Sequence, residues 1–494
     1  MKTKHKNHLL SIVLSMVFLT ASFALFYAAD WFVDTYGRLG FDAILFTLSS
    51  DLSGTSSTLV RDYIRDGLTP ALLWTAAVGF VLFILPALRS RQHHRRSVVL
   101  CLALSLALLG YASWNTEFDD YLLNGKRNST LYEKHYADPD TTPITFPEEK
   151  RNLIYILLES METSYLAKEQ GGAMAENLIP ELYAIARDNV NFSHNEDVGG
   201  FYCTPGATWT IGAMVAHTAG IPLKTPTEDV NMYGKEGEDF LPGVTTLMDI
   251  LHQEGYYQAL MVGSDVTFGG RDVYYGQHGI DTIYDLYTAR KDKIIPKDYF
   301  VWWGMEDLHL FEYAKQELTE IAQQEQPFAF TMLTVDTHHI GGYQCIYCQE
   351  SASGETYDQS ISCSSRQVAA FLEWIREQDF YKNTTVVIVG DHESMDNGYF
   401  ERMTENGYQR MVYNCFINAA ADAGQTQNRK FAAVDLFPTT LAALGCTIEG
   451  NRLGLGTNLF SDTPTLIEEM SLPGFETQIS MGSDYYEEVF YNQK

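Results

Sequence analysis

The stretch TTVVIVGDHE, residues 384–393, decides the fold class of this protein. Its first seven residues form a short, mostly apolar run, which predicts a strand that is buried on both faces. The run ends directly in Asp391, His392 and Glu393. Open α/β sheets bind ligands at the carboxyl ends of their strands, so charged side chains at this point indicate a functional site.

Three further runs predict buried strands, at residues 152–158, 257–263 and 327–335. The first is followed by Glu159, and the third ends in Asp336, Thr337, His338 and His339. Amphipathic helical patterns lie between the runs, at residues 177–186, 244–255, 308–322 and 364–378. This alternation predicts an α/β fold with a mostly parallel central sheet covered by helices. Polar groups at three strand ends are then expected to share one site.

Three runs near the N-terminus, 9–29, 68–88 and 97–116, contain no charged side chain. Each is long enough to cross roughly 30 Å of hydrocarbon as a helix. A cleavable signal peptide is the alternative for the first run, which follows Lys2, Lys4 and Lys6. Such signals have an apolar core of only ~7 to 15 residues, so we predict a three-helix membrane domain instead.

The basic residues predict how the chain is oriented. The leader is basic, and the loop between the second and third runs holds Arg89, Arg91, Arg95 and Arg96. Both belong in the cytoplasm, which places the chain after Thr116 on the outer face of a bacterial cell membrane. The predicted organisation is a transmembrane domain (1–116), a polar linker (117–150), an extracellular catalytic domain (151–460) and a C-terminal tail (461–494).

Charge and cysteine content narrow the function classes. The net charge is −29, with 63 acidic and 34 basic residues, which excludes nucleic acid as a partner. Of the seven cysteines, only Cys101 lies in a predicted membrane helix. Cys345 and Cys348 form a Cys-x-x-Cys pair, which is compatible with zinc or redox chemistry. A second such pair for a closed zinc site is missing, and a disulfide with Cys363 explains the cluster equally well.

Glu159, Asp391 and His392 offer the mixture of carboxylate and imidazole ligands that suits manganese or zinc. The alternative for Asp391 and His392 is a helix cap or a hydrogen-bonded core pair. Their expected closeness to Glu159 favours a metal. The segment CTPGATWTIGAMVA, residues 203–216, adds threonine hydroxyls where a loop enters a helix. A helix amino end attracts anions and a nearby cation lowers a hydroxyl pKa, so Thr208 or Thr210 could attack phosphorus, although helix capping is the simpler role.

These motifs resemble those of a known family. The residues that carry the resemblance are Glu159, Thr208-Trp-Thr210, Asp336-Thr-His338, Gly390-Asp391-His392 and the closing DLFPTT at 435–440. Over about residues 150 to 460 the chain is similar to the sulfatase-like transferases of the alkaline phosphatase superfamily. These include lipoteichoic acid synthases, glucan phosphoglycerol transferases and lipid A phosphoethanolamine transferases. The phrases WTIGAMVA (209–216), GIPL (220–223), DTHHIGG (336–342) and DAILF (42–46) resemble the glucan phosphoglycerol transferases most.

The resemblance implies a ligand set and residue roles. It implies one divalent metal, Mn²⁺ with Zn²⁺ or Mg²⁺ as alternatives, held by Glu159, Asp391, His392 and the nucleophilic threonine. We choose Thr210, the second threonine of the Thr-x-Thr motif, with Thr208 as the alternative. The resemblance further assigns Arg271 and His338 to the head group. Two positions depart from the synthase pattern, because Gly269 stands in place of its tryptophan and Val262 in place of its histidine, so glycerol contacts are expected to differ.

The activity implied is transfer of phosphoglycerol from phosphatidylglycerol to a glycan, glycolipid or polyglycerophosphate acceptor through a phosphothreonine intermediate. His338 is predicted to protonate a leaving oxygen, because the ordinary histidine pKa of about 6.5 makes both states accessible. The alternatives are a phosphoethanolamine transferase, a sulfatase or phosphodiesterase, and a non-catalytic sensor or binding module. Cys203-Thr-Pro resembles the sulfatase Cys-x-Pro motif, but no arginine follows it.

Overall fold

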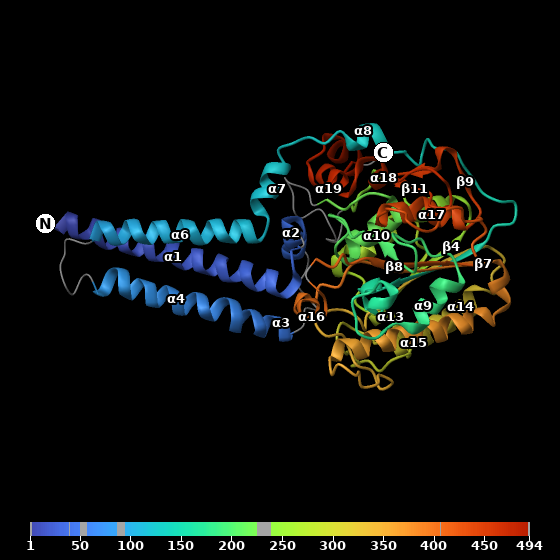
Figure 1. Cartoon of the computed structure of the whole chain (residues 1–494), viewed down its shortest axis with the longest axis horizontal. Coiled ribbons are helices and arrows are strands. Elements are labelled where there is room, and N and C mark those ends of the chain that lie inside the picture. The colour runs from blue at the N-terminus through green and yellow to red at the C-terminus, as the bar shows by residue number, and fades with distance from the viewer. Residues whose placement is uncertain are drawn as a thin grey trace. The chain divides into compact units, whose positions relative to one another are not determined.

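The computed structural model describes residues 2–38, 40–49, 57–85, 94–224, 239–405 and 407–492. The chain forms two compact units. The smaller contains Met1–Phe41 and Thr55–Leu123, and the larger contains Asp42–Gly54 and Asn124–Lys494. Figure 1 labels their helices and strands.

The smaller unit is helical. Its helices are α1 (Lys2–Tyr36), α3 (Ser57–Asp62), α4 (Thr69–Gly79), α6 (His94–Asn115) and α7 (Phe118–Asn124), the last of which ends at the boundary with the larger unit. Among the described residues, three helical segments are long and apolar enough to cross a membrane: Leu10–Tyr36, Val60–Ile84 and Arg95–Asn115. The predicted apolar helices are therefore confirmed, and the chain is a membrane protein. Residues 86–88 of the second predicted run, and Arg89 and Arg91, lie outside the described residues.

The larger unit is built on a central sheet. Within the described residues it has seven strands in the order β3-β8-β7-β2-β6-β4-β5. Their bounds are β2 (Asn152–Leu158), β3 (Gly200–Phe201), β4 (Tyr257–Val262), β5 (Thr282–Tyr284), β6 (Phe328–Leu333), β7 (Thr384–Gly390) and β8 (Val412–Ile417). The five strands from β7 to β5 are parallel, and β8 is antiparallel both to β7 and to β3. The predicted mostly parallel sheet is confirmed.

Helices cover both faces of this sheet. In Figure 1, α9 (Pro180–Asp188), α14 (Asp307–Ile321) and α15 (Thr356–Arg376) lie on one side of the strands, and α10 (Thr210–Ala219) and α17 (Leu436–Ala443) on the other. Ile154 and Ile156 of β2 pack in a core cluster with residues of α9, α14 and α15. Tyr155, which alternates with them, is 3.1 Å from His217 of α10. Because both faces are covered, the central strands are uninterrupted apolar runs.

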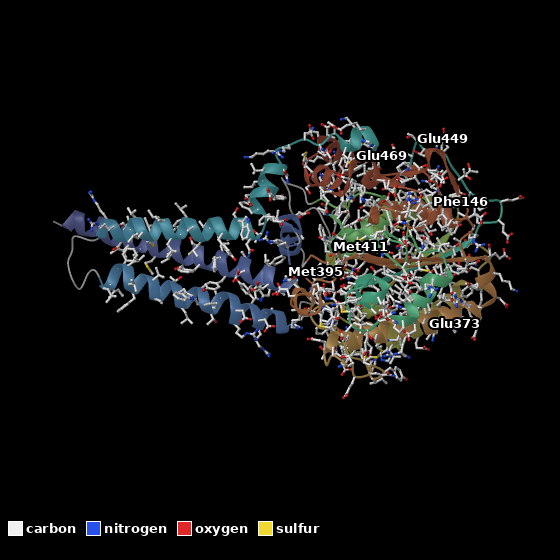
Figure 2. All side chains as sticks on the ribbon, in the orientation of Figure 1. Phe146, Glu373, Met395, Met411, Glu449 and Glu469 are labelled. Carbon is white, nitrogen blue, oxygen red and sulfur yellow. The ribbon has the colours of Figure 1, made fainter. Side chains whose placement is uncertain are left out.

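The remaining elements of the larger unit are short. They are α2 (Phe41–Ser49), α8 (Leu131–His135), α11 (Leu247–Gln253), α12 (Arg271–Gln277), α13 (Leu286–Lys291), α16 (Asn397–Met403), α18 (Leu466–Met470) and α19 (Leu472–Ser480). Two antiparallel pairs also occur, β1 (Ile144–Thr145) with β9 (Thr447–Ile448), and β10 (Arg452–Leu453) with β11 (Gly456–Thr457). In the side-chain view of Figure 2, the labelled Glu373 of α15 lies on the outer face of that helix, where its side chain is 67% exposed.

The segments predicted as linker and tail contact each other within the larger unit. Tyr132 is buried, and its ring centroid lies 5.5 Å from that of Tyr486 and 5.7 Å from that of Phe490. Ile144 pairs with Ile448. The aromatic residues of these two segments are too widely spaced to give an apolar periodicity in the sequence, although each of them buries a large surface. The packing of residues 124–150 and 461–492 therefore differs from that of a free linker and tail.

Candidate active site

Two carboxylates leave the sheet side by side. Glu159 directly follows β2 and Asp391 directly follows β7, and Leu158 pairs with Gly390 at the ends of these parallel strands. A Cβ atom at Gly390 would lie 2.1 Å from the carbonyl oxygen of Met161, so a side chain here would collide with the loop after β2. The glycine therefore permits the close approach of the two strand ends.

His392 completes a compact group with these carboxylates. One ligand atom from each of Glu159, Asp391 and His392 lies within 4.8 Å of the others. The Nε2 atom of His392 is 3.3 Å from Asp391 Oδ2 and 3.7 Å from Glu159 Oε1. All three side chains are buried. Burial of two carboxylates together is unfavourable unless a positive charge lies between them.

The hydrogen bonds leave one carboxylate oxygen of this group, Asp391 Oδ2, without a partner among the described residues, whereas Glu159 Oε1 accepts from Ser160 Oγ at 2.8 Å. Asp391 Oδ1 accepts hydrogen bonds from the N–H groups of Ser160 and His392, both at 2.8 Å. Asp391 Oδ2 is buried and accepts no hydrogen bond from the described residues. The Nδ1 atom of His392 is 2.7 Å from the carbonyl oxygen of Glu393, which assigns the N–H to Nδ1 and the lone pair to Nε2. An unpaired carboxylate oxygen and an imidazole lone pair that face each other fit one divalent cation.

Burial and the neighbouring charges shift the pKa values in this group. Burial and the neighbouring Glu159 raise the pKa of Asp391 to about 7. Burial lowers the pKa of His392, but Asp391 and Glu159 outweigh it and the net shift is upward. Without a cation, protons therefore remain on this group near neutral pH.

Thr210 lies next to the group. It is the first residue of α10, where the backbone changes from the extended conformation of Trp209 to helix. Its Oγ1 atom is 3.4 Å from Glu159 Oε2 and 3.3 Å from His392 Nε2. Thr208 Oγ1 is buried and has no hydrogen-bond partner among the described residues. The geometry therefore favours Thr210 over Thr208 as the hydroxyl next to the ligands.

Arg271 is also close to Glu159. It begins α12 after two glycines, Gly269 and Gly270, with φ of 71° and 70°. Its Nη2 atom donates to Ser264 Oγ at 2.9 Å and to the carbonyl oxygen of Asp265 at 2.6 Å. Burial lowers the pKa of Arg271 to about 10, and the negative charge of Glu159 partly offsets this shift. Its Nε atom is buried and donates to no described residue, so a donor remains available.

The pKa of His338 differs from the ordinary histidine value on which the sequence prediction rests. Its Nδ1 atom is 2.8 Å from the carbonyl oxygen of His339, and its ring centroid is 4.4 Å from that of Trp303. Burial lowers the pKa of His338 to about 4, and the charges of His392, Asp391 and Arg271 also act on it. The ring is therefore neutral at pH 7, with its lone pair on Nε2. This protonation state suits a hydrogen-bond acceptor rather than the proton donor that the sequence predicts.

The sequence analysis missed a buried ion pair that supports the site. Glu162 and Arg410 form this pair, and Arg410 Nε donates to Glu162 Oε2 at 2.9 Å. Glu162 Oε1 accepts from the N–H of Ser394 at 2.7 Å, which joins the loops after β2 and β7. Met411, labelled in Figure 2, follows Arg410, and its carbonyl oxygen accepts from the N–H of Thr163 at 2.9 Å. A glutamate and an arginine almost 250 positions apart leave no local pattern that could have indicated this pair.

Comparison with known proteins agrees with this architecture. The sulfatase family profile matches residues 151–446, which is more than half of the chain. The chain therefore belongs to the sulfatase family. This confirms the resemblance that the motifs indicate.

Individual relatives extend the similarity. Phosphoglycerol transferase I of Escherichia coli (strain 55989 / EAEC) is 29% identical over 430 residues, which are 85% of this chain and 53% of that protein. The chain thus spans about half the length of the curated relatives that it matches. Among solved structures, lipooligosaccharide phosphoethanolamine transferase A of Neisseria meningitidis superposes with a TM-score of 0.50 at 14% identity, covering 88% of this chain and 84% of that one. The lipoteichoic acid synthase LtaP of Listeria monocytogenes has a TM-score of 0.49 at 16% identity, covering 65% and 79%.

Proposed function

We propose that this protein is a metal-dependent phosphoglycerol transferase. In this proposal it moves the head group of phosphatidylglycerol to a glycan, glycolipid or polyglycerophosphate acceptor in the cell envelope. The observation that carries the proposal is the Thr210 hydroxyl, which lies 3.4 Å from Glu159 and 3.3 Å from His392 at the amino end of a helix. The identity with a phosphoglycerol transferase of E. coli supports the choice of head group.

In the first step, Thr210 Oγ1 attacks the phosphorus of the lipid phosphodiester. A bond forms between Oγ1 and phosphorus, and the bond between phosphorus and the oxygen of diacylglycerol breaks. The hydroxyl proton leaves along the hydrogen bond to Glu159 Oε2, and the released diacylglycerol oxygen takes a proton from solvent. The product on the enzyme is a glycerophosphoryl ester of Thr210.

In the second step, a hydroxyl of the acceptor attacks the same phosphorus, so that a bond forms between the acceptor oxygen and phosphorus and the bond between Thr210 Oγ1 and phosphorus breaks. Glu159 returns its proton to Thr210 Oγ1, and the proton of the acceptor hydroxyl passes to solvent. His338 Nε2 accepts a hydrogen bond from a hydroxyl of the glycerol head group or of the acceptor, because its ring is neutral. Arg271 Nε donates to a non-bridging phosphoryl oxygen. A guanidinium suits this task because it is planar, and burial strengthens its interaction with an anion.

Glu159, Asp391, His392 and the Thr210 oxygen would hold the cation. When bound, a divalent cation lowers the pKa of an adjacent hydroxyl and offsets the charge on the phosphoryl oxygens. Two carboxylates and one imidazole are compatible with Mn²⁺, Zn²⁺ and Mg²⁺. We choose Mn²⁺ and keep Zn²⁺ and Mg²⁺ as alternatives.

The membrane helices fit this reaction, because they would keep the site near its lipid donor. We propose three spans, with Arg95 and Arg96 at the start of α6 on the cytoplasmic side and the catalytic domain (151–460) on the outer face. Residues 124–150 and the C-terminal segment then belong to the same unit as the catalytic domain.

A phosphoethanolamine transferase is the second candidate, because the similarity to the Neisseria transferase covers 88% of this chain. A sulfatase that uses Cys203 is less well supported. Cys203 Sγ lies 3.5 Å from the carbonyl oxygen of Ala207, to which it donates, whereas the hydroxyl next to the ligand group is that of Thr210.

The test is lipid turnover by the full-length protein in detergent with Mn²⁺ and fluorescent phosphatidylglycerol. We expect diacylglycerol release by the wild type and Thr208→Ala, and a loss on the order of 10³-fold or more for Thr210→Ala. Release only from phosphatidylethanolamine would replace the proposed head group. Loss in Thr208→Ala with activity retained in Thr210→Ala would replace the nucleophile.

A further inference from the structure

Three cysteine thiols converge outside the site described above. Cys345 and Cys348 lie in the loop between β6 and α15, and Cys363 lies in α15. Cys345 Sγ is 3.5 Å from Cys363 Sγ and 3.7 Å from Cys348 Sγ, and all three sulfur atoms are within 4.8 Å of one another. All seven cysteines of the chain lie among the described residues and carry free thiols.

These separations match a tetrahedral metal site. With zinc–sulfur bonds of about 2.3 Å, two sulfur ligands at tetrahedral corners are about 3.8 Å apart. A disulfide joins only two sulfur atoms and would leave the third cysteine of this cluster as a lone thiol. The triangle of sulfur atoms is therefore better explained by a ligand that contacts all three.

Two buried carboxylates adjoin Cys345, which is one corner of the triangle. One oxygen from each of Glu306 and Asp336 lies within 4.8 Å of Cys345 Sγ and of the other carboxylate. Glu306 Oε2 and Asp336 Oδ2 are buried and accept no hydrogen bond within the part of the chain that the structure describes. Neither carboxylate pairs with a lysine or arginine of the described residues; the ion pair recorded for Glu306 is with His309 at 4.0 Å. Unpaired buried oxygens beside Cys345, whose sulfur also contacts two further thiols, indicate a cation.

We propose that Cys345, Cys348 and Cys363 bind one zinc ion as thiolates. The fourth position is taken by an oxygen of Asp336 or Glu306, directly or through a water molecule. A carboxylate of Asp336 or Glu306 thus takes the place of the cysteine that a second Cys-x-x-Cys pair would supply. Cys348 is only partly buried, which gives the ion a route from solvent.

The ion would fasten the loop that carries His338 to helix α15. His338 and Cys345 lie on the same loop, seven positions apart. The loop is already tied to α15 by Gln344, whose Nε2 atom donates to Ser360 Oγ at 2.9 Å and to the carbonyl oxygen of Gly342 at 3.1 Å. A zinc site at Cys345 would add a strong second attachment one residue further on. The cysteines are thus positioning residues for His338.

The first test uses the full-length wild-type protein and Co²⁺ alone as the probe, because cobalt bound to thiolates shows a charge-transfer absorption band. Free thiols are counted in parallel, in denaturant with chelator and without reductant. We expect the band and seven reactive thiols. Five reactive thiols together with no band would mean a disulfide and would overturn the proposal. This result does not depend on any activity.

The second test assigns the ion to these ligands by metal content. Cys348→Ser is expected to lose one equivalent of zinc, whereas the control Cys446→Ser, which alters a buried thiol outside the cluster, is expected to lose none. Asp391→Asn, which alters the other ligand group, is expected to keep the thiolate–cobalt band. An unchanged zinc content and band in Cys348→Ser would contradict the assignment.

Discussion

The protein contains two groups of potential metal ligands that differ in chemistry and in origin. Glu159, Asp391 and His392 are oxygen and nitrogen donors at the carboxyl ends of neighbouring parallel strands. Cys345, Cys348 and Cys363 are sulfur donors on a loop and a helix. The first group has a hydroxyl beside it, because Thr210 Oγ1 lies 3.3 Å from His392 Nε2.

This difference separates a reactive site from a structural one. Hard and borderline cations with an open position activate oxygen nucleophiles, whereas a site filled by thiolates holds a cation closed off from substrate. We therefore expect changes in the strand-end group to abolish turnover, and changes in the cysteine group to act mainly on stability.

The largest effect is expected for Asp391→Asn. The amide keeps the shape of the side chain but removes the charge and one cation ligand, so turnover of phosphatidylglycerol should fall on the order of 10³-fold. Diacylglycerol release and metal content measure this. The matched control is Asp422→Asn at an exposed position, which should change neither. Normal turnover by Asp391→Asn would remove this group from the reaction.

Arg271→Lys is expected to lower kcat/KM by roughly 10- to 100-fold. Lysine keeps the positive charge but lacks the Nε donor that is buried without a partner among the described residues. The control is Arg402→Lys, because the Arg402 guanidinium is exposed and pairs with Glu355 at 3.0 Å. Equal kcat/KM values for Arg271→Lys and wild type would show that no planar donor contacts the phosphoryl group.

Metal affinity at the strand-end group should weaken as pH falls from 8 to 6. Burial and Glu159 raise the pKa of Asp391 to about 7, so a cation must displace a proton there at lower pH. Each displaced proton weakens apparent affinity about tenfold per pH unit. Unfolded Asp391 has the lower, ordinary pKa, so its proton stabilises the metal-free fold at low pH, and this stabilisation is lost as pH rises through 7.

Thermal unfolding measures this dependence. The increase in Tm on adding Mn²⁺ should be larger at pH 8 than at pH 6, because more of the ligand group is then free of protons. Asp391→Asn serves as the comparison and should show a smaller increase at both pH values. A larger increase at pH 6 than at pH 8 would contradict the raised pKa of Asp391.

The sequence predicts the central strands and helix α14 closely, and the start of α15 less well. The strands at 152–158 and 384–390 are predicted to the residue, because burial on both faces produces an unbroken apolar run. Helix α15 begins at Thr356, eight residues before the predicted start. Its first turns bury polar side chains such as Asp358 and Ser360, which conceals the apolar periodicity.

Some features of the site could be predicted from the sequence and others could not. Glu159, Asp391 and His392 could be predicted as neighbours because each directly follows a central strand. The protonation state of His338 could not, because its pKa depends on the surroundings that the fold creates, which include the ring of Trp303 from another loop. Glu306 beside Cys345 could not either, because only the fold brings these positions together.

The smallest effect on catalysis is expected for Cys348→Ser. The cysteine group does not contact the reacting atoms, so kcat should change by less than about threefold, whereas KM should rise several-fold as the loop that carries His338 loosens. Tm should fall, because an ion that binds only the folded chain stabilises it. Separate measurement of kcat, KM and Tm, with Cys446→Ser as the control, distinguishes these effects. A loss of kcat as large as that of Asp391→Asn would mean that the two ligand groups serve one reaction and that the distinction between them is wrong.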